Sequence, residues 1–216
     1  MTTNDTGRLS GGKVDFTLMY VAHRAVEQDL QRLATAVADG RASDLAVRAS
    51  CHTFKNQLHI HHHAEDRSLW PALRRKTTRP DDVAVVDLME AEHASIDRLL
   101  SSVDTSLTAE DETALDASVQ TLTASLTADV EHEENQALPL VATLLGPKGW
   151  AEFRRTTGKT EGLRGGAEFV SWMLDDTPAA TRKRVLGLLP PPVRLLYRSR
   201  WRRGYARTAR WDTATT

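Results

Sequence analysis

The sequence predicts an all-α protein, an antiparallel up-down-up-down four-helix bundle followed by a helical, basic C-terminal extension. Apolar residues recur at three- and four-residue steps in four long segments between residues 14 and 146, as in amphipathic helices. Short polar connections separate these segments, the first with a glycine and the second with a proline, which favours antiparallel neighbours. We therefore divide the chain into a leader at 1–13, a bundle at 14–146 and an extension at 147–216.

Composition is consistent with a globular protein. The 216 residues are 40% hydrophobic and 26% charged, enough for one sizeable core and an extension. No apolar run approaches the roughly 18 residues of a membrane span, and residues 1–13 read as a polar, flexible leader. The single cysteine, Cys51, excludes an internal disulfide and fits a reducing compartment. We expect a cytoplasmic protein.

Each bundle helix has recognisable ends. Asp15 is a plausible N-cap for the first helix, which extends to Gly40. The second is expected from Ser43 to the turn at 76–80, and the third follows that turn. The fourth is expected to begin at Thr108 and to end at the Gly-Pro pair after Leu145.

Histidines and carboxylates interrupt all four apolar stripes. In an antiparallel bundle these interruptions fall at one level, roughly 14–24 Å from the same end at ~1.5 Å rise per residue. Burying such groups costs several kcal/mol unless something compensates them, and one or two metal ions would compensate all of them together. The candidate metal ligands are His23, His61, His62, Glu65, His93, Asp129 and Glu133, with His132 beside them.

A second pattern relates the second and fourth helices. Glu65 lies six residues before Pro71, and Glu133 lies six residues before Pro139. Because proline removes a helical hydrogen bond, the repeated spacing predicts a paired bend next to the polar layer and a twofold relation between these helices.

The donor types indicate which metal to expect. Imidazoles and carboxylates without a nearby thiolate suit iron or manganese, with zinc as an alternative. Glu65 and Glu133 stand on facing helices and could bridge a metal pair.

With these motifs in place, residues 14–146 resemble the hemerythrin-like proteins with an HHE cation-binding domain. The resemblance rests on His23, the H-x3-E motif at His61 and Glu65, the Glu-His pair ending at His93, and the segment 129–133. It implies a four-helix bundle with two non-haem iron ions, bridged by carboxylate and by an oxo or hydroxo group. The C-terminal portion is also similar to extensions of actinobacterial members.

The fourth helix departs from the family pattern. Asp129 stands where a histidine is expected four residues before Glu133, and the only nearby histidine is His132. Asp129 lies at the centre of the apolar stripe and His132 at its edge, so Asp129 is favoured, with His132 as the alternative. His62 is either an additional ligand or a hydrogen-bond donor to one. The lower histidine content argues against reversible oxygen carriage.

The resemblance implies a redox function with a small-molecule partner. The centre would react with O2, peroxide or nitric oxide in redox or iron homeostasis, and catalase-like decomposition of peroxide is one enzymatic form of this function. The alternative is a non-catalytic sensor or binding module for oxygen, nitric oxide or iron that acts through the basic C-terminal segment.

The extension carries a strong charge asymmetry. Residues 180–216 contain ten basic residues and one acid, a net of +9, which leaves −10 for the preceding residues. We expect the extension to pack on the acidic bundle, with an anionic surface as the other candidate partner and no nucleic acid. Within it, a short helix at 150–157 and a glycine-rich loop at 158–166 are expected.

Overall fold

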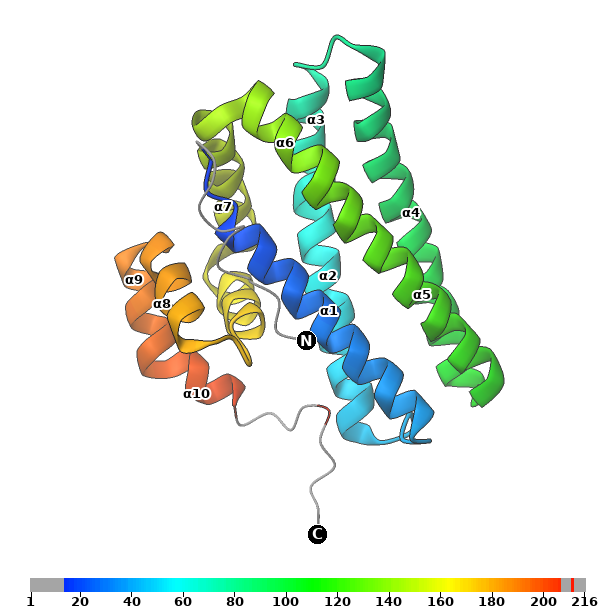
Figure 1. Ribbon diagram of the computed structural model, residues 1–216. Helices are drawn as coiled ribbons and strands as arrows, with labels where there is room; N and C mark the ends of the chain where they lie inside the picture. Colours follow the sequence, from blue (N-terminus) through cyan, green and yellow to red (C-terminus); the bar gives the residue numbers. More distant parts are fainter. Residues whose placement is uncertain (1–13, 207–210, 212–216) are drawn as a thin grey trace.

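The computed structural model describes residues 14–206 and Trp211, and these residues contain helices and connections but no strand. Four long helices lie side by side, each running opposite to its neighbour along the chain (Figure 1). Their bounds are α1 Thr17–Ala38, α2 Leu45–Ala64, α4 Pro80–Ala109 and α5 Glu112–His132. The all-α prediction is confirmed; the predicted leader at 1–13 lies outside the described residues.

The second and fourth bundle helices each continue through a π-helical turn. The segments after α2 are η2 Glu65–Leu69 and α3 Trp70–Arg74; those after α5 are η3 Glu133–Ala137, α6 Leu138–Leu140 and η4 Val141–Leu145. The Trp70 N–H donates to the Glu65 carbonyl, and the Leu138 N–H donates to the Glu133 carbonyl. The first of these wider turns precedes Pro71 and the second precedes Pro139. Each turn lets its helix continue across a residue that has no N–H. The repeated glutamate-proline spacing therefore corresponds to paired π turns.

Three of the four bundle helices begin within two residues of the start that the sequence predicts. The Asp15 carboxylate accepts a hydrogen bond from the Thr17 N–H at 2.9 Å, as a residue at the start of a helix should. The expected start of the fourth helix at Thr108 is wrong, because Thr108 belongs to the last turn of α4. The cap is Asp111, whose carboxylate accepts from the Ala114 N–H at 2.9 Å.

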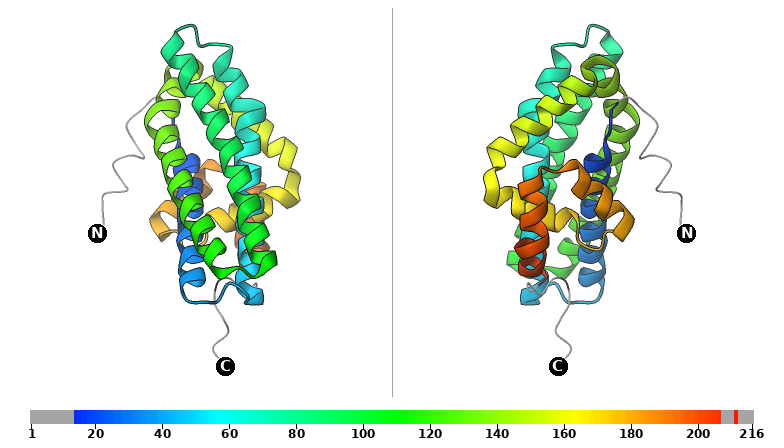
Figure 2. Two further views of the ribbon diagram at one scale, coloured as in Figure 1. Left: turned by 90° about the vertical axis from the view of Figure 1, so that its right-hand side faces the viewer. Right: turned by 90° about the vertical axis from the view of Figure 1, so that its left-hand side faces the viewer.

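The extension is more helical than its sequence suggests. Its elements are α7 Gly146–Met173, α8 Ala179–Leu188, α9 Pro191–Leu196, η5 Tyr197–Trp201 and α10 Arg202–Tyr205. The expected loop at 158–166 is wrong: α7 is helical on both sides of a single break at Gly162, where φ is 63° and ψ is −168°. These helices lie against one side of the bundle (Figure 2). No helix in the described ranges is long and apolar enough to cross a membrane.

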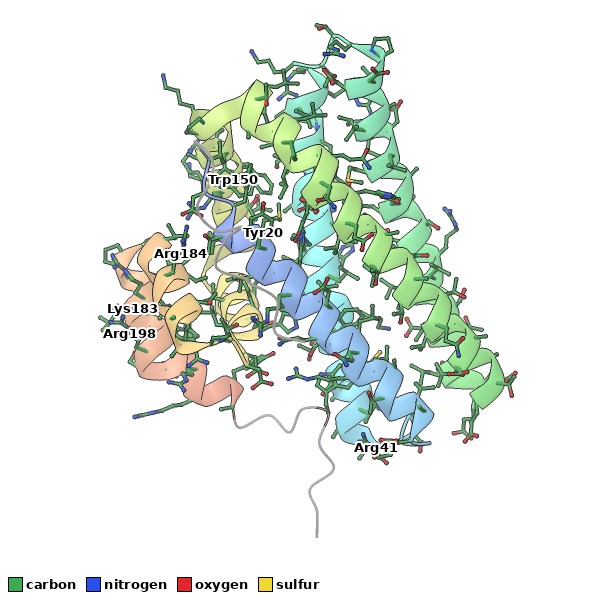
Figure 3. The ribbon with its side chains drawn as sticks, viewed as in Figure 1. Tyr20, Arg41, Trp150, Lys183, Arg184 and Arg198 are labelled. Carbon is green, nitrogen blue, oxygen red and sulfur yellow. The ribbon has the colours of Figure 1, made fainter. Side chains whose placement is uncertain are left out.

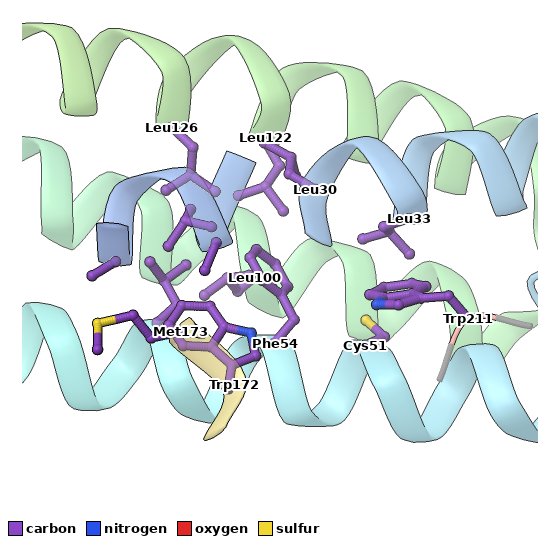
Figure 4. Close-up of a cluster of buried hydrophobic side chains, with 14 of the residues drawn as sticks. Leu30, Leu33, Cys51, Phe54, Leu100, Leu122, Leu126, Trp172, Met173 and Trp211 are labelled. Carbon is purple, nitrogen blue, oxygen red and sulfur yellow. The ribbon is translucent and has the colours of Figure 1, made fainter. Parts of the chain in front are cut away.

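A buried carboxylate on α1 holds the extension to the bundle. Asp29 is 1% exposed and accepts hydrogen bonds from the indole N–H groups of Trp172, at 2.8 Å, and Trp211, at 2.9 Å. Arg32 also donates to it at 2.9 Å. Both indoles pack into the apolar core, Trp172 beside Met173 and Trp211 beside Cys51 (Figure 4). One charge thus joins two distant parts of the extension to the same helix.

The outer side of the extension is basic. Arg184 forms an ion pair with Asp15 at 3.3 Å, whereas Lys183 and Arg198 are exposed and lie on the side away from the bundle (Figure 3). The apolar residues Tyr197 and Trp201 pack toward the core.

Cys51 is predicted to be unreactive in the folded protein. It is 3% exposed, and burial raises the pKa of its thiol to about 11, against the opposing effect of Lys55. Because only the thiolate attacks disulfide reagents, we expect labelling by a disulfide reagent at pH 8 to be at least about 100-fold slower in native protein than in denaturant. Native labelling within a few fold of the denatured rate would contradict this placement.

Candidate metal centre

Seven candidate side chains meet in one buried layer of the bundle. They come from all four bundle helices, and each is at most 8% exposed. Their nearest donor atoms form two groups, in each of which the atoms lie within 4.8 Å of one another. The first group is His23, His61, Glu65 and Glu133; the second is His62, His93 and Asp129.

The first group is centred between α1 and the two π turns. His23 Nε2 lies 2.9 Å from Glu133 Oε2, and His61 Nε2 lies 3.5 Å from Glu65 Oε1. Both glutamates begin a π-helical turn. A π turn at a functional site commonly redirects one side chain, and here it does so at equivalent places in two helices.

The second group is centred on Asp129. Its two oxygens face two imidazoles: Oδ2 lies 3.5 Å from His62 Nε2, and Oδ1 lies 3.7 Å from His93 Nε2. The two rings are stacked, with centroids 3.9 Å apart and planes 3° apart. His62, which the sequence left between two roles, therefore points its Nε2 into the group.

Glu65 connects the two groups. It is 0% exposed, and while Oε1 faces His61, Oε2 lies 3.8 Å from His93 Nε2. A carboxylate with one oxygen toward each of two donor groups has the arrangement expected of a bridge. Glu133 faces His23 of the first group.

His132 lies outside both groups. Its Nδ1 is 2.7 Å from Glu92 Oε1, and its side chain is 37% exposed. The structure thus brings Asp129 into the layer and leaves His132 at the surface of the bundle.

Two carboxylates that the sequence analysis did not assign to the site orient its imidazoles. His23 Nδ1 lies 2.9 Å from Glu134 Oε1, and His93 Nδ1 lies 2.7 Å from Asp66 Oδ1. Each contact can hold the proton on Nδ1 and leave Nε2 free to bind a cation. The available signal was the repeated acidic pair, since Asp66 follows Glu65 as Glu134 follows Glu133.

Burial controls the protonation of three groups in the layer. It lowers the pKa of His61 well below its usual value, and the neighbouring His23 lowers it further. Burial and then His93 do the same to the pKa of His62. Burial raises the pKa of Glu65 well above its usual value, and Glu133 adds to this effect. Without a cation, the layer therefore favours neutral forms of these groups.

The two imidazoles with outer carboxylate partners behave differently. Burial alone would lower the pKa of His23, but Glu133 and Glu134 raise it well above its usual value. Burial likewise opposes protonation of His93, whereas the hydrogen bond to Asp66 raises its pKa. A cation bound at Nε2 would compete with these protons, so metal binding should release protons.

Several oxygens in the layer have no hydrogen-bond partner among the described residues. They are both carboxylate oxygens of Glu65, Asp129 Oδ1 and Glu133 Oε1. Buried oxygens normally find a donor, so a cluster of exceptions needs an explanation. Two donor atoms that bind the same ion at about 2.1 Å lie about 3.0–3.4 Å from each other. The nitrogen–oxygen separations of 3.5–3.8 Å in the layer are close to this distance. The residues therefore fit metal ions better than they fit hydrogen bonds to one another.

Comparison with known proteins agrees with this geometry. The family model described as the hemerythrin HHE cation binding domain matches residues 14–141, which is more than half of the chain and a range that includes the seven residues of the layer. Searches of curated proteins and of solved structures found no significant match.

Proposed function

The chain belongs to the hemerythrin HHE cation-binding domain family, and on this basis we propose that it holds two non-haem iron ions and reacts with O2, peroxide or nitric oxide. The observation that carries the proposal is the position of Glu65, which faces one donor group with each oxygen. One metal would bind His23, His61 and Glu133, the other would bind His62, His93 and Asp129, and Glu65 would be shared.

The donor set favours iron or manganese over zinc. Four imidazoles and three carboxylates, with no thiolate, suit iron or manganese more than zinc, which usually takes four ligands. When bound, iron supplies the one-electron and O2 chemistry that the protein's own side chains lack. Manganese and zinc remain the competitors that metal analysis must distinguish.

The protein's own residues would control how this centre meets its partner. Asp66 and Glu134 hold the outer ring nitrogens, so the imidazoles keep their orientation when a small molecule enters. Trp70, which is 0% exposed, forms part of the apolar surroundings of the layer, with its ring centroid 6.3 Å from that of His93. Exclusion of bulk water strengthens the field that the carboxylates exert there.

Exchange of Asp129 for alanine is predicted to remove about one of the two metal ions per chain. The side chain supplies the oxygens that face both His62 and His93, and alanine has none. Elemental analysis of purified, iron-loaded protein measures this directly. The matched control is His132→Ala, which should retain the full content because its ring pairs with Glu92 at the surface. The reverse pattern, with metal lost from His132→Ala alone, would assign the ligand to His132.

The reaction itself is tested by peroxide consumption. We expect iron-loaded protein to consume peroxide catalytically and the Glu65→Ala variant to lose that activity. Stoichiometric consumption of about one peroxide per centre, with oxidation of the iron, would instead favour a sensor. Neither reaction, in protein with full iron content, would exclude peroxide as the partner and direct the test to O2 and nitric oxide.

One observation favours the sensor alternative. The extension contacts both α1 and α2, which carry His23 and His61, and it is held by Asp29 six residues after His23. A change in the centre that shifts α1 would therefore reach the extension. Limited trypsin digestion of iron-loaded and iron-free protein tests this coupling; equal cleavage rates in the extension would argue against it.

A further inference from the structure

A cavity lies between the bundle and the extension. Its volume is about 820 Å³, within the roughly 300–1,000 Å³ typical of pockets for small organic molecules. One wall comes from α1 and α2 and the other from α7 and the segment around α9. The cavity borders the donor layer at His61, which contributes to its wall.

The walls are mainly apolar. The bundle contributes mainly aliphatic side chains, and the extension contributes both aromatic and aliphatic ones. The principal wall residues are Leu18, Met19, Ala22, Phe153, Phe169 and Met173. Such walls favour a hydrocarbon chain over a polar molecule, because binding removes the apolar surfaces of both the chain and the walls from water, which lowers the free energy.

The charged residues that the structure describes along the cavity wall are all basic. Among the lining residues whose side chains the structure describes, none is Asp or Glu, while Arg154, Arg155 and Lys159 are present. Arg155 is paired with Glu152, because its Nε donates a hydrogen bond to Glu152 Oε2 at 3.1 Å. Arg154 and Lys159 form no ion pair in the described part of the chain.

Arg154 is the cation best placed to receive an anion. It is partly buried in the wall and donates one hydrogen bond, from an Nη to the Leu188 carbonyl at 2.9 Å. Burial lowers the pKa of this guanidinium, and the charge of Asp15 offsets only part of that effect. A guanidinium has five N–H donors, and it binds carboxylates through two of them.

We propose that this cavity binds an amphipathic carboxylate of the fatty-acid class, with its carboxylate on Arg154 and its chain between α1 and α7. The two features that define such a ligand are one anion and a long apolar body. They match Arg154, which has no ion pair in the described part of the chain, and the apolar walls. Because His61 lines the same cavity, the bound chain lies beside the donor layer. The inference does not depend on which metal the layer holds or on whether it is an enzyme.

Binding is measured with dodecanoate, below its micelle concentration, on the full chain. Trp150 and Trp201 line the cavity, so their fluorescence reports occupancy, and calorimetry gives the stoichiometry. We expect saturable binding of one dodecanoate per chain. Affinity should increase about fourfold per added methylene from octanoate to dodecanoate, the effect of burying each group. Dodecanol should bind at least tenfold more weakly.

Two variants locate the site. Arg154→Gln keeps a donor for the Leu188 carbonyl but removes the charge, and should weaken dodecanoate binding at least tenfold. Gly166→Leu should weaken dodecanoate and dodecanol alike, because Gly166 lines the cavity and a Cβ there meets no atom within 4 Å. Arg198→Gln, an exposed arginine of the extension that does not line the cavity, is the matched control and should bind as the parent does.

The outcomes separate this inference from the metal proposal. Iron content and helical circular dichroism should be unchanged in Arg154→Gln, Gly166→Leu and Arg198→Gln. Absence of saturable binding, equal affinity for dodecanol and dodecanoate, or full affinity in both cavity variants would each overturn the proposal. If Arg154→Gln does not fold, the Gly166→Leu variant and the chain-length series still decide it.

Discussion

Replacement of Glu65 by alanine is expected to reduce the metal content from two ions per chain to nearly none. Glu65 is fully buried, faces a donor of each group and has no hydrogen-bond partner for either oxygen in the described part of the chain. Even residues that only orient ligands contribute about 10–100-fold to metal affinity. Removing a shared ligand should therefore weaken binding of both ions at least about 100-fold.

The control for Glu65 is Glu131→Ala. Glu131 lies on the fourth bundle helix near Glu133 but is exposed and outside both donor groups. Its replacement should leave two ions per chain. Glu65→Gln should resemble Glu65→Ala in metal content, because a neutral amide is a poor substitute for a bridging carboxylate. Full iron content in Glu65→Ala would show that the two groups bind metal without a shared residue.

The largest effect on stability is expected for Asp29→Ala. This change leaves the buried indole N–H groups of Trp172 and Trp211 without that acceptor and removes one of the carboxylates that pair with Arg32. Removing one partner of a buried charged network typically costs about 3–5 kcal/mol. For a chain of this length, that lowers the melting temperature by roughly 6–20 °C.

Denaturant unfolding measures the effect of Asp29→Ala, and protease digestion locates it. Because both indoles belong to the extension, trypsin should cleave the extension faster in the variant than in the parent. Asp39→Ala is the control, since Asp39 is an exposed carboxylate at the end of the same helix, with an ion pair to Arg41 at 3.3 Å. If the two variants unfold within about 0.5 kcal/mol of each other, Asp29 does not hold the extension.

Apolar periodicity was sufficient to predict the bundle because each helix buries one continuous stripe. It failed at the start of the fourth helix, where Thr108 and Asp111 are both acceptable caps. The choice depends on how far α4 extends, and Glu110 ends it with a left-handed φ of 54°. Residues 158–166 were expected to form a loop because glycine disfavours helices. In the protein, packing of α7 on the bundle outweighs that preference on both sides of Gly162.

The donor layer was predictable from the sequence because its residues interrupt apolar stripes at one level. The role of Asp66 and Glu134 was not, since the direction of each side chain depends on the π turns at Glu65 and Glu133. Helical periodicity alone cannot specify a local change from i→i−4 to i→i−5 bonding. The same limit applies to Asp29, which accepts from indoles more than a hundred residues away.

Anomalous X-ray diffraction at the iron edge, from crystals of the iron-loaded protein, tests the two-metal centre most directly. We predict two iron peaks in each chain, one among His23, His61 and Glu133 and the other among His62, His93 and Asp129, with Glu65 contacting both. A single peak, a peak at His132, or no transition metal in the layer would contradict a centre shared through Glu65.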